Sequence, residues 1–148
     1  MDRVLKSKEA ACDRGRCFEI ELPTHVDERG RLTIVEGGRN VPFSIERIYY
    51  LTDFAPGTTR GAHAHRKLEQ VMVAVGGSFD VYLSDGRNEW THRLDRSDIG
   101  LYMAPYVWHE IRYCSPGAVC LMLASMPYDE SDYIRNFEQF CSLVNGAK

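Results

Sequence analysis

Turn-forming residues divide residues 18–124 of this chain into many short runs of β-forming residues. Residues 18–22 alternate apolar and polar side chains, residues 45–51 are rich in β-branched and aromatic side chains, and residues 119–124 are apolar throughout. Glycine and proline lie between the runs, and Gly76-Gly77 has the composition of a hairpin turn. Short strands at such spacing are typical of an all-β sandwich or small barrel. The other runs are 32–35, 70–75, 78–83, 88–94, 101–105 and 109–113.

The tail of the chain has a different pattern. Residues 129–132 have the composition of a helix start, and Tyr133, Phe137, Phe140 and Val144 follow at a spacing near 3.6 residues. We therefore expect a short C-terminal helix. The 148 residues contain no repeat and no linker. We expect a loose, charged N-terminal arm at residues 1–16 and a single domain at residues 17–148.

The overall charge limits the ligands that the chain can attract. The formal net charge is -3 and the sequence pI is about 5.9, so no global field favours nucleic acid or an acidic membrane surface. An anionic ligand must therefore be held by a local group of arginines. No signal-peptide segment and no apolar run of membrane-spanning length is present. The five cysteines have no paired spacing, and we expect reduced thiols in a cytoplasmic protein.

The segment RGAHAH, from Arg60 to His65, contains two histidines two positions apart. In an extended segment the imidazoles of His63 and His65 project from the same face. Three interpretations are open: the pair ligates a metal, transfers protons, or only fills the polar mouth of a barrel. Neutral histidine has a pKa near 6.5, so proton transfer at neutral pH lies within its chemistry.

The spacing around these histidines is similar to a known motif. The pattern G-x5-H-x-H-x3-E-x6-G resembles the first motif of the cupin superfamily, whose members are β-barrels of jelly-roll type. It is formed here by Gly57, His63, His65, Glu69 and Gly76. The second motif is matched, with a shortened proline-to-histidine spacing, by Gly100, Pro105 and His109. In metal-binding cupins, histidine and glutamate ligands of this kind suit iron, manganese, nickel or zinc. The corresponding residues of this chain would be His63, His65, Glu69 and His109. Gln70, at the alternative position of the acidic ligand, and the shortened spacing disfavour a metal.

Three arginines and one tyrosine are candidates for binding a substrate. Arg29, Arg47 and Arg60 lie on expected turns or strands, and a guanidinium fork suits the oxygens of a diphosphate. Tyr49 shares a strand face with Arg47, whereas Tyr50 points to the opposite face. Tyr49 is therefore the better candidate for the pocket.

Other polar and aromatic residues complete the candidates. Trp108 suits stacking on a base or sugar, and packing in the core explains it equally well. Gln70 and His109 are further candidates for substrate binding. His25 and His92 lie in polar surroundings, and we expect both side chains to be exposed.

Longer segments resemble one family, the dTDP-4-keto-6-deoxy-glucose 3,4-ketoisomerases of bacterial sugar biosynthesis. The segments are DERGRL, NVPFSIERIYYL, RGAHAHRKLEQV, GLYMAPYVWHEI and YDESDYIRNFEQF, and the resemblance covers about residues 18–140. It implies a jelly-roll homodimer that needs no metal or other cofactor, with His63 and His65 as the catalytic acid–base residues. The chain differs from the family in its longer, cysteine-bearing arm and in Ala62, where an aromatic residue is expected.

The implied substrate is a dTDP-linked 4-keto-6-deoxy sugar. The C4 ketone acidifies the C3 proton, so one histidine can remove this proton to give an enediol or enediolate. Return of a proton at C4 leaves the ketone at C3, as in the biosynthesis of a deoxy (3-amino) sugar. Arg60 or Tyr49 can stabilise the oxyanion. The alternatives are a dTDP-sugar 3,5-epimerase, a metal-dependent cupin enzyme and a non-catalytic sugar-nucleotide-binding cupin.

Overall fold

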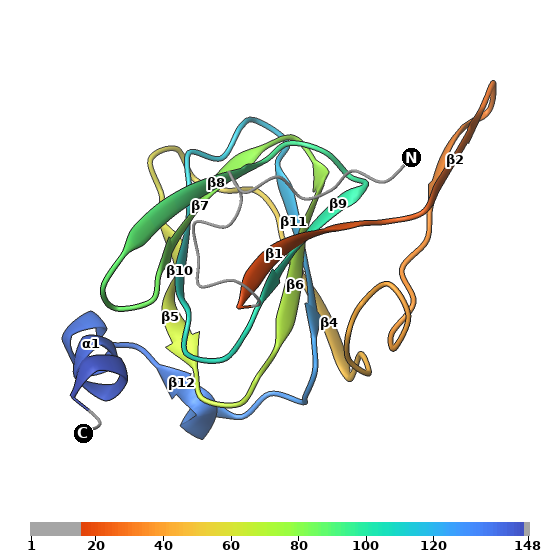
Figure 1. Cartoon of the computed structure of the whole chain (residues 1–148). Helices are drawn as coiled ribbons and strands as arrows, with labels where there is room; N and C mark the ends of the chain where they lie inside the picture. The colour runs from red at the N-terminus through yellow and green to blue at the C-terminus, as the bar shows by residue number, and fades with distance from the viewer. Residues whose placement is uncertain (1–15, 147–148) are drawn as a thin grey trace.

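A computed structural model describes residues 16–146, and β-strands predominate in it (Figure 1). The predicted loose arm lies outside the described residues except for Arg16, whose guanidinium donates to the carbonyls of Pro105 and Tyr106. The strands are β1 (Cys17–Glu21), β2 (Thr24–Asp27), β3 (Gly30–Thr33), β4 (Arg47–Leu51), β5 (Arg60–His65), β6 (Gln70–Gly76), β7 (Phe79–Ser84), β8 (Glu89–Leu94), β9 (Ile99–Met103), β10 (Trp108–Arg112), β11 (Val119–Ala124) and β12 (Tyr133–Ile134). The helical elements are the 3₁₀ turn η2 (Glu130–Asp132) and the helix α1 (Phe137–Asn145).

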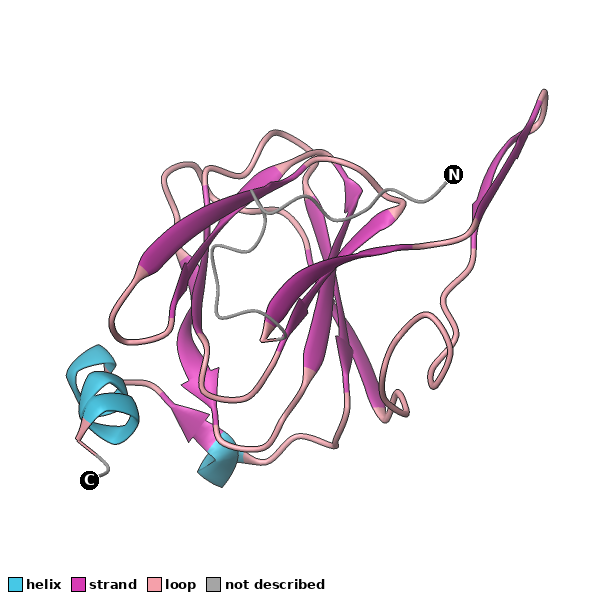
Figure 2. Cartoon of the chain, viewed as in Figure 1, coloured by secondary structure: helices cyan, strands magenta, loops and turns pink. Residues whose placement is uncertain are grey.

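The strands form two five-stranded antiparallel sheets and a separate hairpin. The first sheet has the order β1-β9-β6-β11-β4, the second has the order β12-β5-β10-β7-β8, and β2 pairs with β3. From β4 to β12 the chain passes repeatedly from one sheet to the other, and the sheets enclose a common interior (Figure 2). Such crossing connections are characteristic of a jelly roll. The predicted all-β, cupin-type jelly-roll β-barrel with a short C-terminal helix is therefore confirmed.

Strand β6 illustrates how the sequence leads to this arrangement. Met72 and Ala74 pack in the interior of the barrel, while Val71 and Val73 pack on its outer side with Tyr102. A strand that is covered on both faces has no polar side, which explains why this run is almost continuously apolar. Burying each large aliphatic side chain contributes about 1.5–3 kcal/mol.

The β2–β3 hairpin projects away from the barrel (Figure 1). A turn forms its tip, where the Asp27 carboxylate accepts from the backbone amide of Arg29. The run predicted at residues 32–35 is displaced by two residues, because β3 pairs with β2 rather than with the barrel. Val26 and Leu32 are 64% and 61% exposed. The other predicted runs match strands to within two residues at either end.

The predicted start of the C-terminal helix was wrong. Asp129 caps only the single turn η2, and the chain then extends so that Tyr133 pairs with His65 of β5. The edge of β5 offers backbone hydrogen bonds, which favours an extended segment here. The helix begins at Phe137, where the side chain of Asn136 provides the N-cap.

The two histidines expected to be exposed differ from each other in their exposure. His25 is exposed, as predicted. His92 is only 15% exposed, because its Nε2 lies 2.8 Å from the carboxylate of Glu19.

Within residues 16–146, no helix has the length and apolar character needed to cross a membrane.

Candidate active site

Strand β5 presents both predicted histidines to the interior of the barrel. His63 and His65 meet edge to face, with ring centroids 4.8 Å apart. Ala64 between them points outward and is completely buried against Trp108 and Phe140. The prediction that the two imidazoles share one face is confirmed.

An irregularity in β5 adjusts the direction of these side chains. Its register with β10 passes from His63 opposite His109 to Arg60 opposite Ile111, so three steps along β5 face two along β10. Gly61 accommodates the extra residue at φ +70, a conformation that costs a residue with a Cβ about 1–2 kcal/mol. Bulges of this kind re-aim side chains beside a site.

Strand β10 adds a third imidazole to the pair. His109 is fully buried, with its ring centroid 4.7 Å from that of His63 and 6.2 Å from that of His65. Its Nε2 lies 3.4 Å from Nε2 of Gln70, at the start of β6. The structure therefore brings four residues predicted from two separate motifs into one cluster.

A cavity of about 440 Å³ opens beside His63 and His109, and His65 is not part of its lining. This volume lies in the range of small-molecule sites. Tyr49 lines the cavity, whereas Tyr50 faces outward and is 68% exposed, so alternation separated the two tyrosines correctly. The full lining comprises Tyr49, Leu51, Arg60, Gly61, Ala62, His63, Met72, His109, Ile111, Met122, Tyr133 and Arg135.

Arg47 lies near this cluster on strand β4. In the pairing of the first sheet, Ala124 of β11 is opposite both Arg47 and Gln70. The guanidinium of Arg47 lies over the rings of Tyr49 and Tyr128, at 5.1 and 5.6 Å from their centroids. Its Nε and Nη2 atoms are buried without a hydrogen-bond partner.

Asp132, which the sequence analysis did not single out, contacts His65 directly. Its Oδ2 lies 3.2 Å from Nδ1 of His65, and both side chains are buried. The backbone amides of Lys67 and Leu68 donate to the same carboxylate at 2.7 and 3.2 Å. The signal in the sequence was the acidic DESDYIR segment, which the helical pattern assigned to a helix start.

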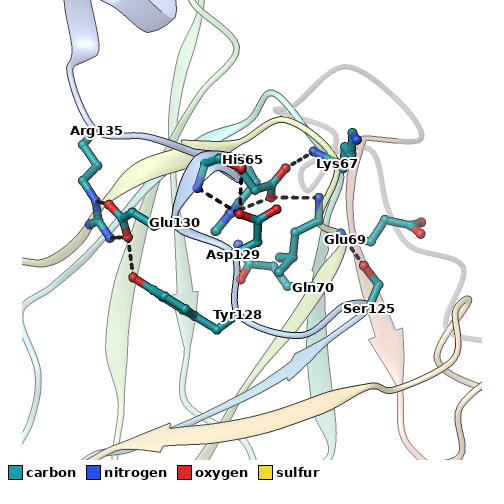
Figure 3. A network of polar contacts seen from close by, with 12 residues as sticks. His65, Lys67, Glu69, Gln70, Ser125, Tyr128, Asp129, Glu130 and Arg135 are labelled. Carbon is teal, nitrogen blue, oxygen red and sulfur yellow. Dashed lines mark hydrogen bonds and ion pairs between the residues drawn. The ribbon is translucent and has the colours of Figure 1, made fainter.

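The segment around β12 contributes two further residues that the sequence analysis missed. The ring centroid of Tyr133 lies 4.9 Å from that of His63 and 4.4 Å from that of His65. Arg135 lies over Tyr133, at 4.3 Å, and donates two hydrogen bonds to Glu130 (Figure 3). The C-terminal segment thus forms one wall of the site.

All three clustered histidines are held in the neutral form. Burial, with smaller contributions from the nearby imidazoles and Arg135, lowers the pKa of His63 to about 2. Burial also lowers the pKa of His109 to about 3. Burial lowers the pKa of His65 as well, but only to about 4, because the nearby Asp132 opposes part of the effect of burial.

Several polar atoms of the cluster are buried without a partner. They include Nε2 of His63, Nε2 of His65, Nδ1 of His109 and Oε1 of Gln70. Buried polar groups normally form hydrogen bonds. The cluster therefore has unused donors and acceptors for a polar ligand.

Two of the predicted substrate-binding residues, Trp108 and Arg29, lie away from both the cavity and the histidine cluster. Trp108 is buried between β10 and α1, where it packs against Phe140, so the core interpretation describes its position. Arg29 lies at the tip of the projecting hairpin, with its guanidinium 2.6 Å from the carboxylate of Asp27. Its side chain is 83% exposed.

Of the four ligands considered for a metal, the three histidines come together, but Glu69 lies apart from them. The carboxylate of Glu69 accepts a hydrogen bond of 2.7 Å from the hydroxyl of Tyr102, which packs on the outer side of the first sheet. In residues 16–146, no group of three histidine, cysteine or acidic side chains is arranged to hold a metal ion.

Comparisons with known proteins agree with this architecture. The family model described as FdtA (WxcM-like, C-terminal) matches residues 16–145. The TDP-4-oxo-6-deoxy-α-D-glucose-3,4-oxoisomerase of Aneurinibacillus thermoaerophilus is 47% identical over 132 residues, which cover 87% of this chain and 95% of that protein. The chain belongs to the sugar 3,4-ketoisomerase family. It is accordingly an isomerase.

Solved structures of this family superpose closely on the chain. QdtA, a sugar 3,4-ketoisomerase from Thermoanaerobacterium thermosaccharolyticum solved with TDP, is 37% identical with a TM-score of 0.87, over 90% of this chain and 97% of that one. WlaRB, a TDP-quinovose 3,4-ketoisomerase from Campylobacter jejuni, is 44% identical with a TM-score of 0.82, over 86% of this chain and 98% of that one.

Proposed function

We propose that this isomerase moves the keto group of a dTDP-linked 4-keto-6-deoxy sugar from C4 to C3, with His63 and His65 transferring the protons. The observation that carries the proposal is a pair of neutral imidazoles in contact with each other, each with an unpartnered Nε2, of which His63 lines the cavity. The relatives support the substrate class. A histidine-to-asparagine variant of QdtA, 36% identical to this chain, was solved with TDP-4-keto-6-deoxyglucose.

The chemistry needs a base that is unprotonated at neutral pH. The C3 proton lies next to the C4 ketone, and its removal gives an enediol or enediolate. One imidazole takes this proton, and a proton is returned at C4. The oxygen on C4 gains a proton and the hydroxyl on C3 loses its proton, so that C4 becomes a hydroxyl carbon and C3 a ketone. Two neutral histidines at a ring separation of 4.8 Å can serve adjacent carbons of one sugar.

The enediolate oxygen also needs a positive or hydrogen-bonding partner. Arg135 is already paired with Glu130, and Arg60 is exposed. Arg47 is the stronger candidate, since its buried Nε and Nη2 have no partner. Burial raises the pKa of Tyr49 to about 12, so this residue remains a phenol that can donate a hydrogen bond.

The same proposal includes a binding site for the diphosphate of the substrate and a second copy of the chain. Arg60, at the mouth of the cavity, is suited to a diphosphate oxygen. We infer a homodimer in which the projecting hairpin, with its exposed Val26 and Leu32, packs against a second copy. In that arrangement Arg29 at the hairpin tip would serve the partner's site. A cytoplasmic location stays a prediction, as does a role in making a 3-amino sugar, for which a C3 ketone is the group to be aminated.

An NMR time course with dTDP-4-keto-6-deoxyglucose tests the reaction. We expect the ketone signal to move from C4 to C3, with full activity after chelation of metals. The same incubation in deuterated water excludes a 3,5-epimerase if C5 gains no deuterium. Binding without turnover would instead indicate a non-catalytic cupin, and loss of activity on chelation would indicate a metal enzyme.

Substitution of the two histidines tests their role. We expect His63→Asn and His65→Asn to fold but to lose isomerisation by about 10²–10⁴-fold, the usual contribution of a general acid or base. His92→Asn, on β8 outside the cavity lining, is the control for the effect of losing an imidazole. Near-wild-type turnover in both site variants would refute histidine catalysis.

A further inference from the structure

A turn beside the site holds a tyrosine in an unfavourable backbone conformation. Tyr106 lies between β9 and β10 at φ +59, in the left-handed region that disfavours a residue with a Cβ. It follows Pro105, and a proline followed by a residue of positive φ is the pattern of a type II turn, where glycine or asparagine is usual. Strain of this kind persists only where the surrounding structure holds it, and it is often found at functional sites.

The strained turn contacts strand β5 directly. The backbone amide of Tyr106 donates to the carbonyl of His65 at 2.7 Å. This hydrogen bond lies just beyond the point where His63 of β5 pairs with His109 of β10, so it fixes the end of the strand that carries His65. Because the backbone sets the direction in which a side chain leaves it, a shift of this peptide would move the imidazole as well.

Arg16 holds the same turn from the residue before β1. Its backbone carbonyl accepts from the amide of Ala104 at 2.7 Å, which aligns it with the end of β9. Its Nη2 atom donates to the carbonyls of Pro105 and Tyr106, at 3.0 and 2.6 Å. Both carbonyls of the turn therefore receive a hydrogen bond from a charged donor, which is stronger than one from a neutral donor.

The ring of Tyr106 gives this position a reason to be a tyrosine rather than a glycine. It packs against the buried cluster of Ala64, Trp108, Ile134 and Phe140. The strained backbone is thus held by packing of its own side chain as well as by hydrogen bonds to its carbonyls.

We propose that Arg16 is a positioning residue for the active site. By holding the strained turn at its carbonyls, it keeps the amide of Tyr106 on the carbonyl of His65 and so maintains the direction of the His65 imidazole. Arg16 is not part of the cavity lining, so it acts through the turn and not on the substrate. This role rests on the proposed ketoisomerase function, in which His65 takes part in proton transfer.

Amide hydrogen exchange tests the hold on the turn without any substrate. In the wild-type protein, ¹⁵N NMR should find the Tyr106 amide protected, because it donates to His65. Arg16→Met removes the donors but keeps a long aliphatic side chain, and we expect it to speed exchange of this amide by at least about tenfold. Arg39→Met, at a side chain that is 77% exposed, is the matched control and should leave the exchange unchanged. A smaller effect of Arg16→Met would overturn the proposal.

Kinetics connect the turn with turnover. We expect Arg16→Met to lower kcat by at least about tenfold with little change in KM, since a small misplacement of a reacting group is costly while the binding surface stays intact. Arg16→Lys, which keeps a charged donor, should recover part of the loss. A loss that appears in KM alone would show that Arg16 does not act through His65.

A double-mutant cycle separates release of strain from a general loss of stability. Glycine adopts a positive φ without strain, so in a Tyr106→Gly background the turn needs Arg16 less. We therefore expect Arg16→Met to lower kcat much less in that background than in the wild type, with urea unfolding to check that both backgrounds are folded. Equal losses of kcat in the two backgrounds would contradict the role of the strained turn.

Failure of the proposed function would look different from failure of this positioning role. A wild-type protein without 3,4-isomerase activity would refute the function. The exchange rate of the Tyr106 amide in Arg16→Met would still decide whether Arg16 holds the turn against His65.

Discussion

At the scale of single residues, the site concentrates imidazoles that stay neutral. His63, His65 and His109 all have pKa values well below the reference value of 6.5, and burial is the largest cause for each. A histidine that stays neutral in the folded protein keeps a lone pair available for a proton at physiological pH. The same property makes the folded state sensitive to acid.

We predict that the free energy of unfolding falls as the pH drops below about 6.5. In this range the histidines of the unfolded chain bind protons, whereas the buried histidines of the folded protein stay neutral. The stabilisation is therefore present above pH 6.5 and is lost toward pH 4. The loss is at most about 1.4 kcal/mol per pH unit for each histidine. Urea unfolding followed by circular dichroism at pH 7.5, 6 and 5 measures it.

A matched pair of variants assigns this acid sensitivity to the site. His109→Gln should reduce the slope of stability against pH, because it removes one fully buried imidazole. His25→Gln should leave the slope unchanged, because His25 is exposed. Equal slopes in the two variants would place the sensitivity elsewhere.

At the scale of elements, the C-terminal segment connects the stability of the fold to the site. Phe140 of α1 is completely buried and packs with Ile134 of β12 and Ala64 of β5. Just before β12 lies Asp132, the partner of His65. Docking of the helix therefore supports the position of the carboxylate.

We predict that Phe140→Ala destabilises the protein by about 3–5 kcal/mol, through loss of burial and a cavity under α1. Turnover should fall as well, since the segment that holds Asp132 loses its support. Leu143→Ala, at a site that is 37% exposed, should cost about 1 kcal/mol or less and leave turnover unchanged. Urea unfolding and the NMR assay measure the two effects, and a Phe140→Ala enzyme with full stability would contradict the packing argument.

At the scale of the whole molecule, the projecting hairpin is the part that a single copy leaves without support. An isolated two-stranded hairpin is marginally stable in water, and β2 and β3 pair only with each other among the described strands. Val26 lies opposite Arg31 and Leu32 lies opposite His25, so an exposed apolar residue is present on each face. A second copy of the chain would cover these apolar side chains.

We predict that the protein sediments at twice the chain mass of 16.9 kDa. The double variant Val26→Asp/Leu32→Asp should shift it toward the monomer, because charges would be buried in the interface. Tyr113→Asn is the control: Tyr113 is 77% exposed at φ +53, a conformation that asparagine tolerates. Analytical ultracentrifugation distinguishes the states, and a monomeric wild type would refute the homodimer.

Much of the fold followed from local patterns. Alternation and turn residues located β1, β4 and β6 to β11 to within two residues, because both signals depend on neighbours along the chain. The same alternation placed His63 with His65, and Tyr49 with Arg47. The C-terminal helix was located too early, since residues 129–135 have the composition of a helix start but follow the open edge of β5.

The sequence by itself determined the strand pattern, the paired histidines and the family. Only the tertiary structure decided which distant residues meet them: it brought Asp132 to His65 and turned Trp108 away from the cavity. It also carried Arg29 out on the hairpin. Strand periodicity states which residues share a face, but it does not state which strands become neighbours or in what register. Those are fixed by closure of the barrel, and the carboxylate that contacts His65 lies 67 positions away along the chain.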